Sequence, residues 1–155
     1  MKTKLLLITL ISILVAGVIA PAVKALPPTG PWYQPQTGDQ KPLILAHQGG
    51  EGEYPSNTML AFTKAQEAGA DALDTDLFMT SDKKLVLFHD ETLEHRTNCT
   101  GAIASKTYQE LQQCDAAYHW SPDGGATFPY RGTGITIPKY EDLLSTFPNS
   151  RIGVE

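Results

Sequence analysis

The chain has few positive charges and no cluster of them. Its 155 residues include 12 Lys and Arg against 17 Asp and Glu, a net charge of −5, and the longest basic run is the pair Lys83 and Lys84. Proteins that bind nucleic acid concentrate Lys and Arg on one face, because these side chains displace the counterions of the phosphate backbone. The composition therefore excludes a nucleic-acid partner.

Cysteine is also scarce, with Cys99 and Cys114 as the only two in the sequence. Neither lies in a CxxC or Cys/His spacing, which argues against a zinc site. An even pair in an exported chain can form a disulfide. The residues leave a disulfide and two free thiols equally open.

Long apolar runs are missing except at the N-terminus. There, two lysines precede the mostly apolar run Leu5–Ala20, and small residues and a proline follow it. This order is typical of a secretory signal, and the run is shorter than the roughly 20 residues of a membrane-spanning helix. We predict a signal peptide over residues 1–25, rather than an uncleaved anchor, with cleavage after Ala25 or Ala22.

A signal peptide implies export to the periplasm or the extracellular space. Cleavage after Ala25 removes three of the 12 basic residues and no acidic one, which changes the net charge from −5 to −8. An anionic bilayer repels such a chain, so we expect no stable membrane insertion after cleavage. Residues 26–41 are rich in proline and glycine without an apolar period, which predicts a linker. A folded domain is expected over residues 42–155.

Short apolar runs alternate with helical periodicity in this domain. We predict strands at 43–46, 72–78, 85–88 and 151–155, and helices at about 56–68 and 140–147. This alternation is typical of a parallel α/β fold. About three of the eight strand–helix units of a barrel are recognisable, and a complete barrel needs roughly 250 residues. We therefore expect the chain to be the N-terminal part of a longer protein, without useful activity by itself.

Two aspartates lie two residues apart in one predicted strand. Asp74 and Asp76 point to the same face, and two neighbouring carboxylates repel each other unless a cation, an Arg or a Lys lies between them. A set made only of oxygen ligands selects Mg²⁺ or Ca²⁺, and Glu155 at the end of the next strand completes such a set. The alternative is that the strand lies at the surface and water solvates the two aspartates. Their apolar neighbours in the chain favour a buried strand instead. The pattern predicts a site for Ca²⁺ or Mg²⁺.

Two histidines each follow an apolar run. His47 and His89 are therefore expected at strand ends, where α/β folds place their sites. An isolated histidine is usually a satisfied polar residue, but two beside a carboxylate cluster indicate a general acid and a general base. With a cation, such a pair suits displacement at phosphorus. His95 and His119 lack this setting, and we interpret them as surface residues.

A long glycine- and proline-rich stretch separates the last two predicted units. Loops of this length in compact domains are often functional. The stretch and its border contain Trp120, Phe128 and Tyr130. These aromatic side chains are candidates to line the mouth of a substrate site.

Six motifs follow one another in the domain: His47–Gly50, Tyr54–Thr58, Gly69–Asp76, Leu85–Leu93, Arg96–Gly101 and Gly153–Glu155. In this order they resemble the glycerophosphodiester phosphodiesterase family over residues 43–155. The resemblance implies a TIM (β/α)8 barrel, a divalent cation, usually Ca²⁺ or Mg²⁺, and hydrolysis of glycerophosphodiesters to an alcohol and glycerol 3-phosphate.

The same resemblance assigns roles to individual residues. His47 and His89 match the acid/base histidines of the family. Asp74, Asp76 and Glu155 match its metal ligands. These are the five residues to which the strand pattern also points.

The chain departs from the family pattern at three positions. Gln48 stands where the family usually has an arginine, Ser56 where it has a glutamate, and Asp74 where it has a glutamate. Gln48 is a weak candidate for substrate binding, because an amide lacks the guanidinium fork that grips phosphate. Gln48 removes one positive charge and Ser56 removes one negative charge, so together they leave the local net charge unchanged. We hypothesise that these two changes compensate each other. Gln48→Arg alone is then expected to lower activity.

Three functions are consistent with these residues. The first is a metal-dependent phosphodiesterase that hydrolyses glycerophosphodiesters. The second keeps this chemistry on lysophospholipid or sphingolipid substrates, which the aromatic stretch would admit. The third is a barrel that binds a phosphodiester without turnover, suggested by Gln48 and Ser56.

Overall fold

The computed structural model describes residues 42–155, so the predicted signal peptide (1–25) and linker (26–41) lie outside the described residues. The strands are β1 (Leu45–Ala46), β2 (Ala72–Thr75), β3 (Leu77–Met79), β4 (Leu85–Leu87) and β5 (Arg151–Val154). The α-helices are α1 (Met59–Glu67), α2 (Tyr108–Leu111) and α3 (Tyr140–Thr146), and two short 3-10 helices are η1 (His47–Gly49) and η2 (Ile103–Ser105).

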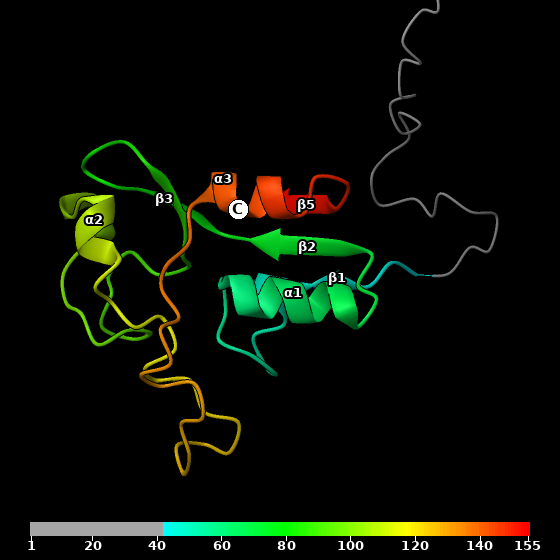
Figure 1. Ribbon diagram of the computed structural model, residues 1–155, viewed down its shortest axis with the longest axis horizontal. Coiled ribbons are helices and arrows are strands. Elements are labelled where there is room, and N and C mark those ends of the chain that lie inside the picture. The colour runs from blue at the N-terminus through cyan, green and yellow to red at the C-terminus, as the bar shows by residue number, and fades with distance from the viewer. Residues whose placement is uncertain (1–41) are drawn as a thin grey trace, which may run out of the picture.

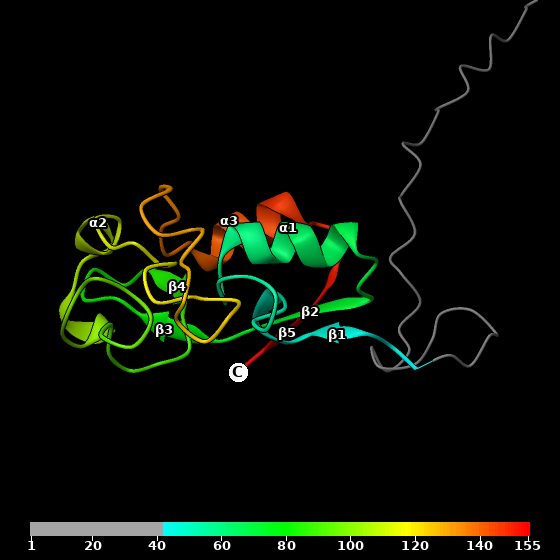
Figure 2. The same cartoon turned by 90° about the horizontal axis from the view of Figure 1, so that it is seen from below.

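Three parallel strands form the main sheet in the order β1-β2-β5 (Figure 1). Helix α1 connects β1 to β2, and α3 precedes β5. Both helices lie on the same side of the sheet (Figure 2). A parallel sheet with crossover helices confirms the predicted α/β class.

A hydrophobic cluster joins this sheet to its helices. It contains Phe62 of α1, Leu73 of β2, Leu87 of β4 and Leu143 of α3, all fully buried. The strand predicted at 72–78 is two strands, β2 and β3, which belong to separate sheets and have Asp76 between them. Its predicted alternation is still present, because Leu73 and Leu77 pack in this cluster and Phe78 packs in a second one. The alternation therefore leaves Asp74 on the face opposite α1.

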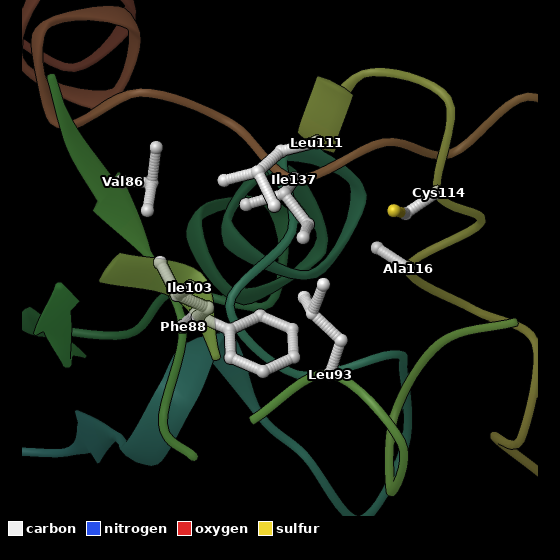
Figure 3. Close-up of a cluster of buried hydrophobic side chains, with 8 residues drawn as sticks. All are labelled: Val86, Phe88, Leu93, Ile103, Leu111, Cys114, Ala116 and Ile137. Carbon is white, nitrogen blue, oxygen red and sulfur yellow. The ribbon is translucent and has the colours of Figure 1, made fainter. Parts of the chain in front are cut away.

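A second cluster lies around the antiparallel hairpin β3-β4 (Figure 3). Its fully buried members include Val86, Leu93, Ile103, Leu111 and Ile137. These residues come from loops as well as from short helices. The cluster thus gives the long connection between β4 and α3 its own core.

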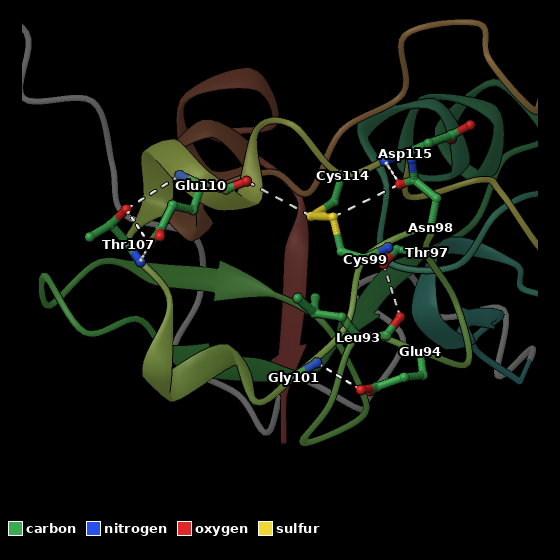
Figure 4. The surroundings of a disulfide bond; sticks show 10 residues. All are labelled: Leu93, Glu94, Thr97, Asn98, Cys99, Gly101, Thr107, Glu110, Cys114 and Asp115. Carbon is green, nitrogen blue, oxygen red and sulfur yellow. Dashed lines mark hydrogen bonds between the residues drawn. A yellow bond between two sulfur atoms is a disulfide. The ribbon is translucent and has the colours of Figure 1, made fainter.

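The two cysteines form a disulfide at the edge of this second cluster (Figure 4). Cys99 and Cys114 are 15 residues apart in the chain, and their Cα atoms are 5.6 Å apart. Of the two alternatives that the sequence leaves open, the structure therefore has the disulfide. It fastens the loop after β4 to the end of α2.

The structure differs from the sequence prediction at several element ends. Helix α1 begins at Met59, not at about Ser56, because Thr58 is its N-cap and accepts a hydrogen bond from the Ala61 amide. Strand β1 has only two residues, and Leu45 is 44% exposed because β1 is an edge strand of the described sheet. Leu144 is also exposed, so only part of the apolar stripe predicted for α3 is buried.

Within residues 42–155, no helix combines the length and apolar character that a membrane span requires.

Candidate active site

The end of β1 places His47 beside the middle of β2. Ala46 pairs with Leu73 in the parallel ladder. The residues that follow these two in the chain, His47 and Asp74, are therefore neighbours. The His47 Nδ1 atom lies 2.9 Å from Asp74 Oδ2. This hydrogen bond raises the pKa of His47 above its ordinary value, against a smaller opposing effect of burial. With Nδ1 engaged, Nε2 is the ring atom available for proton exchange.

The Nε2 atom of His47 faces the loop that follows β1. Glu51 Oε1 lies 3.6 Å from it, and both side chains are about half exposed. This carboxylate also raises the pKa of His47. The imidazole thus lies between one buried and one exposed acid.

A tight turn directly after His47 packs against the start of α1. Gln48, Gly49 and Gly50 all have positive φ angles of 50°, 80° and 94°. A Cβ atom at Gly49 would lie 2.9 Å from Ala61 Cβ and 3.0 Å from the Phe62 amide nitrogen. Only glycine therefore lets the turn approach the helix this closely.

Gln48 is buried in this turn, with 1% of its surface exposed. Its Oε1 atom has no hydrogen-bond partner among the described residues. Buried polar atoms are almost always paired, with protein, water or ligand. Gln48 therefore has an unpaired hydrogen-bond acceptor next to His47, and its predicted role as a weak substrate contact stays a prediction.

Asn57 anchors Asp76. Its Nδ2 atom donates to Asp76 Oδ2 at 2.8 Å, and its Oδ1 atom accepts from the Thr75 hydroxyl at 2.7 Å. Asn57 has a φ of 56°, a conformation that asparagine tolerates better than most residues. Asn57 is therefore part of the site, although the sequence pattern assigned it no role there.

The second histidine belongs to a separate set of contacts. His89 Nδ1 lies 2.7 Å from Asp90 Oδ1, and the Arg96 Nε donates to Asp90 Oδ2 at 3.0 Å. Burial raises the pKa of Asp90, but the hydrogen bonds and charges of His89 and Arg96 outweigh it and lower that pKa below its ordinary value. Asp90 thus orients the ring of His89 with its Nε2 atom free.

Arg96 also connects the two histidine-bearing loops. One of its terminal nitrogens donates to the Ser56 hydroxyl and lies 3.9 Å from Glu51 Oε2. Since Glu51 contacts His47 and Asp90 contacts His89, the guanidinium links both rings through one carboxylate each. Apart from its place in a motif, Arg96 has no local sequence signal that would have identified it.

The carboxylates of Asp74, in β2, and of Asp76, directly after β2, have the chemistry of a cation site. Asp74 is 8% and Asp76 is 7% exposed, and neither contacts a Lys or Arg among the described residues. Two buried carboxylates without a basic neighbour favour a bound cation, and their oxygens match Ca²⁺ or Mg²⁺. A Cβ at Gly153 would lie 3.0 Å from Asp74 Oδ1, so glycine leaves this carboxylate its space.

The third predicted ligand lies beside them on the neighbouring strand. The Glu155 amide donates to Thr75 O at 3.0 Å, and Glu155 O accepts from the Leu77 amide at 3.0 Å, so its backbone flanks Asp76. Its side chain is exposed. Among residues 42–155, no three His, Cys, Asp or Glu side chains are arranged to hold a metal ion. The ligand set of Asp74, Asp76 and Glu155 stays a prediction.

The described residues are similar to known proteins in sequence and in fold. Residues 47–155 match the model of the glycerophosphoryl diester phosphodiesterase family. A glycerophosphodiester phosphodiesterase of Bacillus altitudinis is 40% identical over 101 residues, which cover 65% of this chain and 38% of that protein. The chain thus spans less than half of this relative's length.

Two solved structures are also similar. The glycerophosphoryl diester phosphodiesterase domain of a Mycobacterium tuberculosis protein has a TM-score of 0.70 at 33% identity, over 74% of this chain and 43% of that one. An Oleispira antarctica phosphodiesterase in complex with the product sn-glycerol-3-phosphate has a TM-score of 0.62 at 27% identity, over 73% and 43%. The described α/β unit is part of a TIM barrel, as predicted. The chain belongs to the glycerophosphoryl diester phosphodiesterase family.

Proposed function

We propose that the full-length gene product is a phosphodiesterase that requires a divalent cation and hydrolyses glycerophosphodiesters to an alcohol and glycerol 3-phosphate. The observation that carries the proposal is the pairing of each predicted acid/base histidine with a carboxylate, His47 with Asp74 and His89 with Asp90. Family membership and the two buried carboxylates, which contact no Lys or Arg among the described residues, support it.

The two imidazoles supply proton transfer. Each has its Nδ1 atom held by a carboxylate, which leaves Nε2 to accept a proton from the attacking oxygen or to give one to the leaving alcohol. Asp74, Asp76 and Glu155 would hold the cation, which when bound neutralises charge on the phosphate oxygens. Gln48 would contact the substrate only weakly, because its amide lacks the guanidinium fork of the arginine that is usual at this position.

Export is part of the proposal. The charged, apolar and small-residue order of residues 1–25 supports it, and so does the disulfide, since disulfides persist in oxidising compartments. Detection of the mature protein outside the cytoplasm, with an N-terminus at residue 23 or 26, would test this point. Retention of Met1 in the cytoplasmic fraction would contradict it.

The enzymatic test measures choline release from glycerophosphocholine by the full-length gene product. We expect release that a chelator abolishes and that added Ca²⁺ or Mg²⁺ restores. His47→Ala and His89→Ala should each lower kcat at least about 100-fold, the usual contribution of a general acid or base. Glu67→Gln, on the exposed face of α1, is the matched control and should behave like the wild type.

Two results would contradict the proposal. Release that a chelator does not affect would exclude the cation. Tight binding of the diester in calorimetry, without turnover of this substrate or of lysophosphatidylcholine, would instead support the non-catalytic binding barrel.

A further inference from the structure

A cavity of about 470 Å³ adjoins the candidate active site. Its polar lining comes from the loops after β1, β4 and α2: Ser56, Asp90, His95, Arg96, His119 and Trp120. The volume lies in the range of small-molecule sites. Because Asp90 also holds the ring of His89, a group bound in this cavity lies on the His89 side of the active site.

The charged side chains of the cavity neutralise each other. Arg96 pairs with Asp90 at 3.0 Å and lies 3.9 Å from Glu51. Asp90 in turn has both oxygens engaged, one by His89 and one by Arg96. A cationic group would find no free carboxylate in this lining, and an anionic group would find no free cation.

The remaining lining groups favour neutral hydroxyls. His95 and His119 are the histidines that the sequence left without a role, and both line the cavity. A neutral imidazole offers one hydrogen-bond donor and one acceptor, and a serine hydroxyl such as that of Ser56 offers both. This supply of both donors and acceptors matches a molecule that carries several hydroxyl groups.

An aromatic wall completes the cavity. This wall is Trp120, whose indole nitrogen donates to Glu51 O at 3.1 Å, which fixes the ring. Tyr130 is outside the lining and lies 5.3 Å from Trp120 between ring centres. The flat apolar face of such a ring packs against the C–H groups of a cyclic polyol. This wall was expected from the sequence only as a general substrate mouth.

We infer that this cavity receives the alcohol part of the diester and selects a neutral, hydroxyl-rich alcohol such as a cyclic polyol or a sugar. The inference rests on the proposed function and names the substrate class of the same site. His95 and His119 then act as specificity-determining residues, because each can hydrogen-bond a ring hydroxyl. Trp120 positions the ring.

The experiment compares three substrates of the full-length protein with its cation: glycerophosphoinositol, glycerophosphocholine and glycerophosphoethanolamine. His119→Phe keeps an aromatic ring for the edge-on contact with Tyr118, at 4.9 Å between ring centres, but removes hydrogen bonding. His119→Gln keeps a donor and an acceptor and is the matched control. The same two substitutions at His95 repeat the test at a second position.

We expect the wild type to have its highest kcat/KM for glycerophosphoinositol. His119→Phe should raise KM for this substrate about tenfold, the scale of one lost hydrogen bond. The kcat of His119→Phe for glycerophosphoinositol, and its kcat and KM for glycerophosphoethanolamine, should stay within about twofold of the wild type. The kcat and KM of His119→Gln should stay within about threefold of the wild type.

Four results would overturn the inference. An equal loss of kcat/KM on all three substrates means that the histidines have a structural role. No loss on any substrate in the Phe variants at both positions means that the alcohol lies elsewhere. A highest kcat/KM for glycerophosphocholine means that the aromatic wall binds a cation. A wild type that hydrolyses none of the three refutes the proposed function and this subsite with it.

Discussion

At the scale of single residues, Asp90 lies between a histidine and an arginine. One oxygen holds His89 Nδ1 and the other accepts from Arg96 Nε. A carboxylate in this position fixes the tautomer of the imidazole and stabilises its protonated form. Asp90 is therefore a positioning residue for His89, and Arg96 positions Asp90.

We predict that Asp90→Asn lowers kcat by about 10- to 100-fold and leaves KM within about threefold. The amide keeps the shape of the side chain but cannot stabilise a protonated imidazole. Steady-state kinetics of the full-length protein measure both constants, with Glu67→Gln as the control. A rise in KM at unchanged kcat would show that Asp90 acts on substrate binding instead.

Asp74 depends on the glycine opposite it. Its Oδ2 atom is held by His47, so Oδ1 cannot rotate away from a new methyl group without breaking that hydrogen bond. We predict that Gly153→Ala weakens binding of Ca²⁺ or Mg²⁺ about tenfold or more. Calorimetric titration with the metal salt measures the affinity, and Gly52→Ala, whose Cβ would meet no atom within 4 Å, is the control. An unchanged affinity would remove Asp74 from the ligand set.

At the scale of elements, the turn between β1 and α1 depends on close packing. Gly49 combines a φ of 80° with contact to Ala61 and Phe62 of the helix. We predict that Gly49→Ala lowers the free energy of unfolding by about 2 kcal/mol, because both the backbone conformation and the contact become unfavourable. Urea unfolding should show Gly52→Ala within about 0.5 kcal/mol of the wild type. Equal stability of the two variants would show that the turn can move away from α1.

At the scale of the whole molecule, the disulfide holds the long connection between β4 and α3. Cross-linking residues about 15 apart stabilises a fold by about 3 kcal/mol, chiefly because it restricts the unfolded chain. We predict that the double substitution Cys99→Ala and Cys114→Ala lowers the free energy of unfolding by roughly this amount. Urea unfolding of the wild type with and without reductant should give the same difference, and a wild type insensitive to reductant would contradict the prediction.

Local patterns were sufficient for most of the main strands. The alternation in residues 72–78 predicted that Leu73 and Leu77 face one way and Phe78 the other, and the apolar runs before His47 and His89 predicted their places after strands. These predictions depend only on neighbours in the chain, because side-chain direction in a strand repeats every two residues. The predicted helix start at about Ser56 was wrong. The Ser56 hydroxyl instead accepts a hydrogen bond from Arg96, 40 residues away, and local patterns do not predict such a distant contact.

The amino-acid sequence by itself determined the α/β class, the five candidate acid/base and metal residues, and the family resemblance. Only the tertiary structure decided that Asn57 holds Asp76, that Arg96 connects both histidine-bearing loops, that the cysteines are bonded, and that His95 and His119 face one cavity. Each of these depends on contacts between distant segments. Periodicity describes the direction of a side chain relative to its own element, but only the packing of loops from several elements determines which distant group it meets.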